Sequence, residues 1–206
     1  MPITLGGDHS ITWPAATAVA DVHGYGNVGV VHFDAHADTA DTIDGNLASH
    51  GTPIRRLIDS GAVPGDRFVQ IGLRGYWPPA DVFAWMKEQG MVWHTMHEIW
   101  ERGMQAVIAD AVAEALARAD KLYISIDIDC LDPAFAPGTG TPEPGGIATV
   151  DLLRIVRELS IEHDVVGMDV VEVAPPYDVS DLTVNAAHRL VFEALSGMAE
   201  RRRRAT

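Results

Sequence analysis

The chain has 206 residues, of which 47% are hydrophobic, and its 15 basic and 29 acidic residues give a net charge of −14. This composition predicts one folded domain over residues 1–206 and excludes intrinsic disorder. The negative charge argues against nucleic acid as a partner. No run approaches the roughly 18 apolar residues of a membrane span and no signal peptide is visible, so we expect a cytoplasmic protein that does not contact membranes.

Apolar, β-branched runs alternate along the chain with segments of helical periodicity, a pattern typical of a parallel sheet covered by helices. Thr149 and Ser180 are candidate N-caps. No repeat or linker divides the chain, so the pattern predicts a single α/β domain. In chain order we expect strand 3–5, helix 11–22, strand 28–33, strand 68–72, helix 80–89, strand 91–93, helix 105–119, strand 122–128, helix 150–161, strand 165–171 and helix 182–203.

Polar residues that can carry chemistry follow four of these strands directly. They lie in Gly6-Gly7-Asp8-His9-Ser10, in Asp34-Ala35-His36-Ala37-Asp38, in Asp127-Ile128-Asp129 and at Glu172. Ligands of open parallel sheets collect at the carboxyl ends of the strands, so all four groups should lie at one edge. An extended backbone places alternate side chains on one side, which predicts that Asp34, His36 and Asp38 converge.

Carboxylates with a minority of imidazoles and no thiolate favour a hard divalent ion such as manganese. The candidate metal ligands are His9, Asp34, His36, Asp38, Asp127 and Asp129. Six ligands are too many for one open catalytic ion. Two divalent ions balance the four carboxylates and can hold a hydroxide between them, which predicts a two-metal hydrolase.

The remaining motifs are assigned simpler roles. His50 lies in a glycine-punctuated loop where it can reach a substrate and shuttle a proton. Residues 138–146 lack the lysine of a phosphate-binding loop and are expected to shape the rim of the site. Cys130 is expected to be a neutral thiol. Surface or packing roles are expected for the other histidines, which are His23, His32, His94, His97, His163 and His188.

These motifs resemble those of the ureohydrolases, the arginase and agmatinase family, in Gly6–Ser10, His32–Asp38, Ser125–Asp129 and Asp169–Val173. The similarity runs to the C-terminal helix. Ser49-His50-Gly51-Thr52-Pro53 and residues 132–142 are more similar to the agmatinase-like branch than to arginase itself. Family members carry a further segment before the Gly-Gly-Asp-His motif, which here begins at residue 6. We therefore expect the C-terminal portion of the family fold, N-terminally truncated, and a natural reading frame that extends upstream.

The resemblance implies a three-layer α/β/α fold with a mainly parallel sheet and a centre of two Mn²⁺ ions. Asp34 and Asp127 would bridge the ions. His9 and Asp38 would complete one ion, and His36 and Asp129 the other. It also implies trimers or hexamers.

The resemblance further implies the reaction, in which a guanidinium carbon is attacked to give urea and an amine. Glu172 would hold the guanidinium, His50 would pass a proton to the leaving amine, and Asp38 would accept a hydrogen bond from the hydroxide. Agmatine, cleaved to urea and putrescine, is the first expected substrate. The alternatives are 4-guanidinobutyrate, 3-guanidinopropionate or arginine as substrate, a deacetylase-type metal hydrolase, and a non-catalytic fragment.

Overall fold

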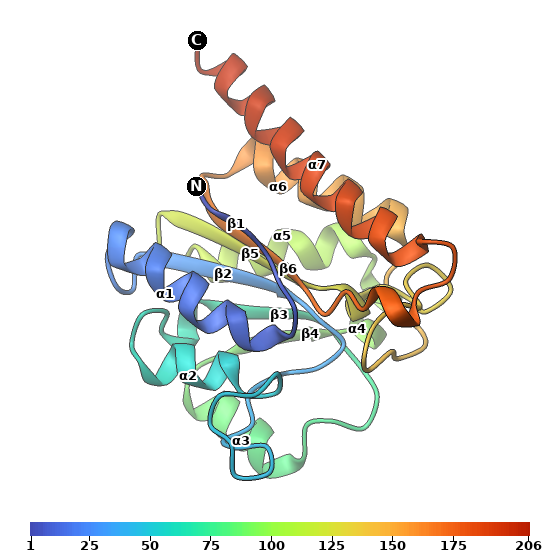
Figure 1. The fold of residues 1–206 in the computed structure, drawn as a ribbon. Coiled ribbons are helices and arrows are strands. Elements are labelled where there is room, and N and C mark those ends of the chain that lie inside the picture. The colour runs from blue at the N-terminus through green and yellow to red at the C-terminus, as the bar shows by residue number, and fades with distance from the viewer.

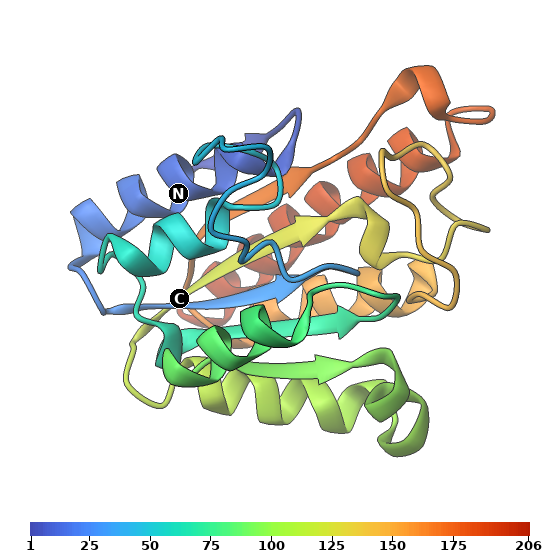
Figure 2. The ribbon, with the colours of Figure 1, turned by 90° about the horizontal axis from the view of Figure 1, so that it is seen from below.

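The computed structural model describes residues 1–206 and is built around one parallel sheet. The six strands follow the order β1-β6-β5-β2-β3-β4, and every neighbouring pair is parallel (Figure 1). Their carboxyl ends therefore lie at one edge, where the connecting loops gather (Figure 2). The strands are β1 (Ile3–Leu5), β2 (Val28–Phe33), β3 (Phe68–Leu73), β4 (Val92–Thr95), β5 (Lys121–Asp127) and β6 (Val165–Val171).

Helices cover both faces of the sheet. One face carries α1 (Thr12–His23), α2 (Pro53–Asp59) and α3 (Ala80–Glu88), and the other carries α4 (Met96–Arg102), α5 (Met104–Ala115), α6 (Thr149–Glu162) and α7 (Leu182–Arg204). Short 3-10 helices span His9–Ile11, Gly65–Arg67, Ile128–Cys130 and Pro175–Tyr177. None of the helices combines the length and the apolar content needed to cross a membrane.

The alternation of side chains along the strands separates two hydrophobic cores. Val30 of β2 packs beneath α1 and α2, whereas Val31 and Phe33 pack beneath α5 and α6. Strands buried on both faces read as continuous apolar runs, which is why their positions could be predicted from the sequence. The three-layer α/β/α prediction is confirmed.

Two helices and two caps differ from the expectations. The helices α2 and α4 were not predicted, because seven residues are too short to establish a period. Thr149 is the first residue of α6, so it is not the N-cap. Ser180 does not cap α7 either; the carboxylate of Asp178 accepts hydrogen bonds from the main-chain N–H groups of Thr183 and Val184 instead.

Candidate metal centre

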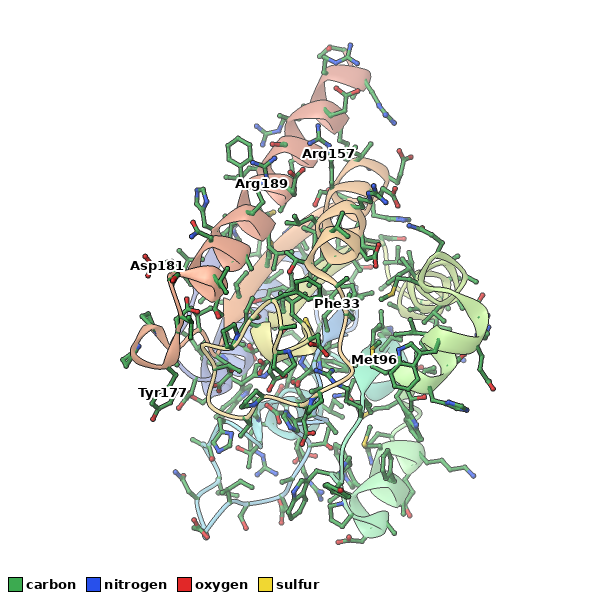
Figure 3. The ribbon with its side chains drawn as sticks, turned by 90° about the vertical axis from the view of Figure 1, so that its right-hand side faces the viewer. Phe33, Met96, Arg157, Tyr177, Asp181 and Arg189 are labelled. Carbon is green, nitrogen blue, oxygen red and sulfur yellow. The ribbon has the colours of Figure 1, made fainter.

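The structure gathers the six predicted metal ligands at the carboxyl edge of the sheet. His9, Asp34, Asp127 and Asp129 are buried, while Asp38 and His36 are only partly covered. Figure 3 views this edge, with Phe33 at the end of β2 near the centre and Tyr177 and Asp181 at the periphery. The cluster therefore lies in the middle of the edge, where β2 and β5 are neighbours.

One half of the cluster surrounds His9. Its Nδ1 lies 3.0 Å from Oδ2 of Asp38, 3.1 Å from Oδ2 of Asp127 and 3.3 Å from Oδ2 of Asp34. A single ring N–H can satisfy only one of these three carboxylates. The arrangement therefore concentrates negative charge around one nitrogen.

The other half joins His36 to Asp129. Nδ1 of His36 lies 3.0 Å from Oδ2 of Asp129 and 3.6 Å from Oδ1 of Asp34. Oδ1 of Asp34 also accepts a hydrogen bond from the His36 main-chain N–H at 2.6 Å. Asp34 consequently faces both halves. Asp127 does so too, because its Oδ2 lies beside His9 and its Oδ1 accepts a hydrogen bond from the Asp129 main-chain N–H at 2.9 Å.

The protonation of the cluster reflects burial and crowding. Burial alone would lower the pKa of His9, but the carboxylates of Asp127, Asp34 and Asp38 hold it well above its usual value. Burial opposes protonation of His36 too, yet Asp129 and Asp34 raise its pKa to about 11. Protons on the two imidazoles thus partly offset the negative charge.

The pKa values of the carboxylates shift in different directions. Burial, with the charges of Asp129 and Asp34, holds the pKa of Asp127 well above its usual range. Burial and the charge of Asp34 also raise the pKa of Asp129. Burial would raise the pKa of Asp34 as well, but the neighbouring imidazoles, led by His32, hold it well below that range. The site is electrostatically strained without a cation.

These residues fit divalent ions. Nδ1 of His9 and Oδ2 of Asp34 are buried and have no hydrogen-bond partner, which is unusual for polar atoms in a protein interior. The spacings of 3.0 to 3.3 Å around His9 match the separation of about 3 Å between neighbouring ligands of an octahedral ion with bonds of about 2.1 Å. Oxygen and imidazole donors without sulfur suit manganese.

A buried hydrogen-bond network contacts His9 on the Nε2 side of its ring and orients it. The hydroxyls of Ser125 and Tyr123 donate to the carboxylate of Asp169 at 2.8 and 2.7 Å. The Ser125 oxygen then accepts from Nε2 of His9, 3.4 Å away. This contact turns Nδ1 toward the carboxylates, as supporting shells do at metal sites.

His32 is buried, as a packing role allows, and it also contacts the cluster. A surface or packing role was expected, but its Nε2 lies 3.0 Å from Oδ2 of Asp34 and its Nδ1 lies 3.2 Å from the amide nitrogen of Gln70. The signal was available, because His32 and Asp34 are two residues apart along β2 and its end. His94 is also buried, although it lies far from the cluster and between Glu98 and Glu114.

Glu172 joins the edge of the cluster from the end of β6. Its Oε1 accepts a hydrogen bond from the main-chain N–H of His9 at 2.7 Å. Its Oε2 makes no hydrogen bond within the chain and lies 3.9 Å from where a side chain at Gly140 would begin. Burial raises the pKa of Glu172. Glu172 and Asp38 have φ of 63° and 52°, and such left-handed residues concentrate at functional sites.

The structure does not place His50 in contact with the cluster. It is exposed, in the loop between β2 and α2. Its charge is close enough to lower the pKa of Glu172 slightly against the larger effect of burial. Cys130 is buried, and burial raises the pKa of its thiol well above the usual value, in line with the neutral thiol that was expected.

Together these observations describe an α/β protein with a largely buried cluster of aspartates and histidines, suited to divalent cations, at the carboxyl edge of its sheet. Comparison with known proteins gives the family: residues 1–197 match the model of the Arginase family. The chain belongs to that family, so the predicted ureohydrolase relationship is confirmed.

Individual relatives give the same result. The chain is 42% identical to guanidinobutyrase of Pseudomonas aeruginosa over 95% of its own length and 60% of that protein. It is 45% identical to mitochondrial agmatinase of Gallus gallus, again over 95% of its length and 56% of the relative. The crystal structure of formimidoylglutamase from Bacillus subtilis superposes with a TM-score of 0.90 at 36% identity, covering 96% of this chain and 60% of that one. The chain therefore spans somewhat more than half the length of these relatives.

Proposed function

We propose that the chain acts as a hydrolase that uses two Mn²⁺ ions to cleave a linear guanidino compound, with agmatine as the first candidate. The products are urea and putrescine. The observation that carries the proposal is the buried Nδ1 of His9 with three carboxylates within 3.3 Å and no hydrogen-bond partner. Such an arrangement is costly unless cations bind in it.

We assign the ligands according to the two halves of the cluster. His9 and Asp38 would hold one ion, His36 and Asp129 the other, and Asp34 and Asp127 would be shared. The two-sided contacts of Asp34 support its shared role. When bound, the ions supply Lewis acidity and a water of lowered pKa as nucleophile.

Glu172 binds the substrate in this proposal. Its Oε1 is fixed by the His9 N–H, and its Oε2 makes no hydrogen bond within the chain. A planar guanidinium presents parallel N–H donors that match a carboxylate. Glu172 thereby orients the guanidinium carbon toward the metal cluster.

Asp38 and His50 handle protons. Oδ2 of Asp38 faces His9, so its second oxygen is free to accept a hydrogen bond from the attacking water. His50 lies on an exposed loop at the mouth, where it can deliver a proton to the amine as the C–N bond breaks.

The charge of the mouth favours a substrate whose far end is cationic. The segments at the carboxyl edge (6–10, 34–52, 74–79, 127–148 and 172–181) contain 12 acidic residues and a single basic one, Arg74. The side-chain N–H groups of Arg74 donate to main-chain carbonyls. Apart from the exposed imidazole of His50, these segments thus leave no cationic side chain free for a substrate carboxylate, which supports agmatine.

A guanidino acid is the second candidate. Relatives named guanidinobutyrase and guanidinopropionase are 42% and 44% identical to this chain. Recognition of a substrate carboxylate would then require His50 or a cation from outside the segments described above.

The test is urea release by manganese-loaded protein from agmatine, arginine, 4-guanidinobutyrate and 3-guanidinopropionate. We expect turnover of agmatine above the others. Turnover of a guanidino acid alone would replace the substrate assignment. No urea from any of the four, with two ions bound, would favour a non-catalytic chain. The matched control is the Asp129→Asn variant, which should bind less metal and release no urea.

We also propose that the protein is cytoplasmic and assembles with copies of itself as a trimer or hexamer. Large apolar side chains left exposed, including Phe192 and Leu195 of α7, support self-association. Light scattering after size-exclusion chromatography measures the mass directly, and a monomer at micromolar concentration would contradict the assembly.

A further inference from the structure

Arg74, directly after β3, uses its side chain in an unusual way for the one basic residue at this edge. All three guanidinium nitrogens donate to main-chain carbonyl oxygens and none donates to a carboxylate. The acceptors are the carbonyls of Gly72, Asp129, Cys130, Leu131, Glu143 and Pro144. A guanidinium whose hydrogen bonds all go to main-chain carbonyls holds the backbone segments that carry those carbonyls together.

The carbonyls belong to separate segments of the chain. Nη2 donates to Asp129 and to Glu143, each at 2.7 Å, and Nη1 donates to Gly72 at 3.2 Å. The main-chain N–H of Arg74 also donates to the carbonyl of Ala35 at 3.1 Å. One residue thereby ties together the end of β3, the loop after β2, the turn after β5 and the loop that contains Glu143.

The guanidinium is partly buried and lies directly against Gly146. A side chain at Gly146 would begin 2.6 Å from Nη2, so the glycine makes room for the group. Lysine offers three donors on one nitrogen and cannot span the same carbonyls, whereas arginine offers five in a rigid plane. The site therefore requires arginine in particular.

These segments hold the carboxylate of Asp129. Its Oδ1 accepts from the main-chain N–H of Ala35 at 3.1 Å, and its Oδ2 accepts from the hydroxyl of Thr141 at 3.2 Å. Arg74 binds the Asp129 carbonyl directly, the Ala35 carbonyl through its own N–H, and the loop two residues beyond Thr141. Both hydrogen bonds of this carboxylate thus depend on segments that Arg74 holds, while the Asp129 main-chain N–H donates to Oδ1 of Asp127 at 2.9 Å.

The other half of the cluster is held differently. His9 is anchored by the carboxylate of Glu172 and by Ser125, and neither group contacts Arg74. We propose that Arg74 is a positioning residue for the His36 and Asp129 half of the cluster only. The inference rests on the proposed function in that this half is taken to hold the second of two ions.

The test is manganese titration of the wild-type chain and of Arg74→Lys and Arg74→Met, followed by calorimetry and electron paramagnetic resonance. We expect the first ion to bind the variants with unchanged affinity and the second at least ~10-fold more weakly, in the range found for supporting residues. The spin-coupled spectrum of the ion pair should give way to the six-line spectrum of a single ion. Arg56→Lys is the matched control, because Arg56 pairs with Asp41 and Asp59 away from the cluster.

The outcomes separate this inference from the proposed function. A wild-type chain that binds fewer than two ions would overturn the metal assignment itself. Two ions in wild type, with both lost equally in the variants or both retained at wild-type affinity, would overturn the role of Arg74 alone. So would failure of both Arg74 variants to fold, judged by near-ultraviolet circular dichroism without metal, since the role would then be general. Thr141→Val should weaken the second ion in the same direction.

Discussion

The carboxylate of Glu172 accepts a hydrogen bond from the main-chain N–H of His9 at 2.7 Å. This contact joins the end of β6 to the turn after β1. It links Glu172, which we propose binds the substrate, directly to His9, which we propose binds metal. A substitution at Glu172 reports on substrate binding alone only if it preserves an acceptor for that N–H.

Glu172→Gln meets this requirement, because the glutamine carbonyl can still accept from His9. We expect the variant to bind manganese as wild type does and to lose at least about 100-fold in kcat/KM, since the charge-assisted pair with the guanidinium is gone. Urea release and metal content measure the two effects. Activity within threefold of wild type would contradict the proposed role of Glu172.

His9→Ala removes the nitrogen around which three carboxylates gather. We expect at least about 100-fold weaker binding of the first manganese ion, with activity lost as a consequence. His97→Ala is the control, because His97 is exposed and contacts only Glu101. Equal metal affinity in the two variants would refute the ligand assignment of His9.

Stability without metal should fall as the pH rises above neutrality. The pKa of His36 is raised to about 11 in the folded chain, against about 6.5 in an unfolded one. Its contribution to stability is therefore complete below about pH 6.5 and is lost progressively toward pH 11. The raised pKa of His9 acts in the same direction.

Manganese should reverse this trend, because it binds imidazoles that have lost their protons. The difference in Tm between manganese-loaded and chelated protein should increase from pH 6.5 to 9, while the chelated protein becomes less stable. Thermal melts in matched buffers measure both curves. A Tm difference that shrinks with rising pH would show that His9 and His36 do not exchange protons for metal.

Gly29→Ala should destabilise the fold. An added side chain would begin 2.2 Å from the carbonyl oxygen of Ala115, so β2 and α5 would have to separate. We expect a loss of about 3 kcal/mol in the free energy of unfolding, measured by urea denaturation. Gly140→Ala is the control, since its nearest neighbour lies at 3.9 Å and its effect should stay within about 0.5 kcal/mol.

The residues of the site were predictable from the sequence to a greater extent than their arrangement. Alternation along an extended strand was expected to bring Asp34, His36 and Asp38 together, but β2 ends at Phe33 and Asp38 adopts a left-handed φ of 52°. The three side chains consequently divide between two halves. Local periodicity carries no information about such a turn.

Contacts between segments far apart in the chain could not be predicted from the sequence either. The role of Arg74 depends on carbonyl groups, which every residue has, so no residue pattern marks them. His32 was passed over because a histidine within an apolar strand looks like a packed core residue. The sheet and the long helices were predicted well because burial on both faces dictates their composition.

The adjacency of β2 and β5 has a consequence for the order of events in folding. Phe33 lies opposite Ile126, so the two aspartate-bearing segments meet only after a long loop of chain has closed. Asp34, His36 and Asp38 are close in sequence, but they are joined by Asp127 and Asp129 only after that pairing. The complete set of ligands is therefore available only in a chain that is already nearly native. Manganese should therefore slow unfolding and leave the refolding rate unchanged, because the ions bind after the rate-limiting step of folding.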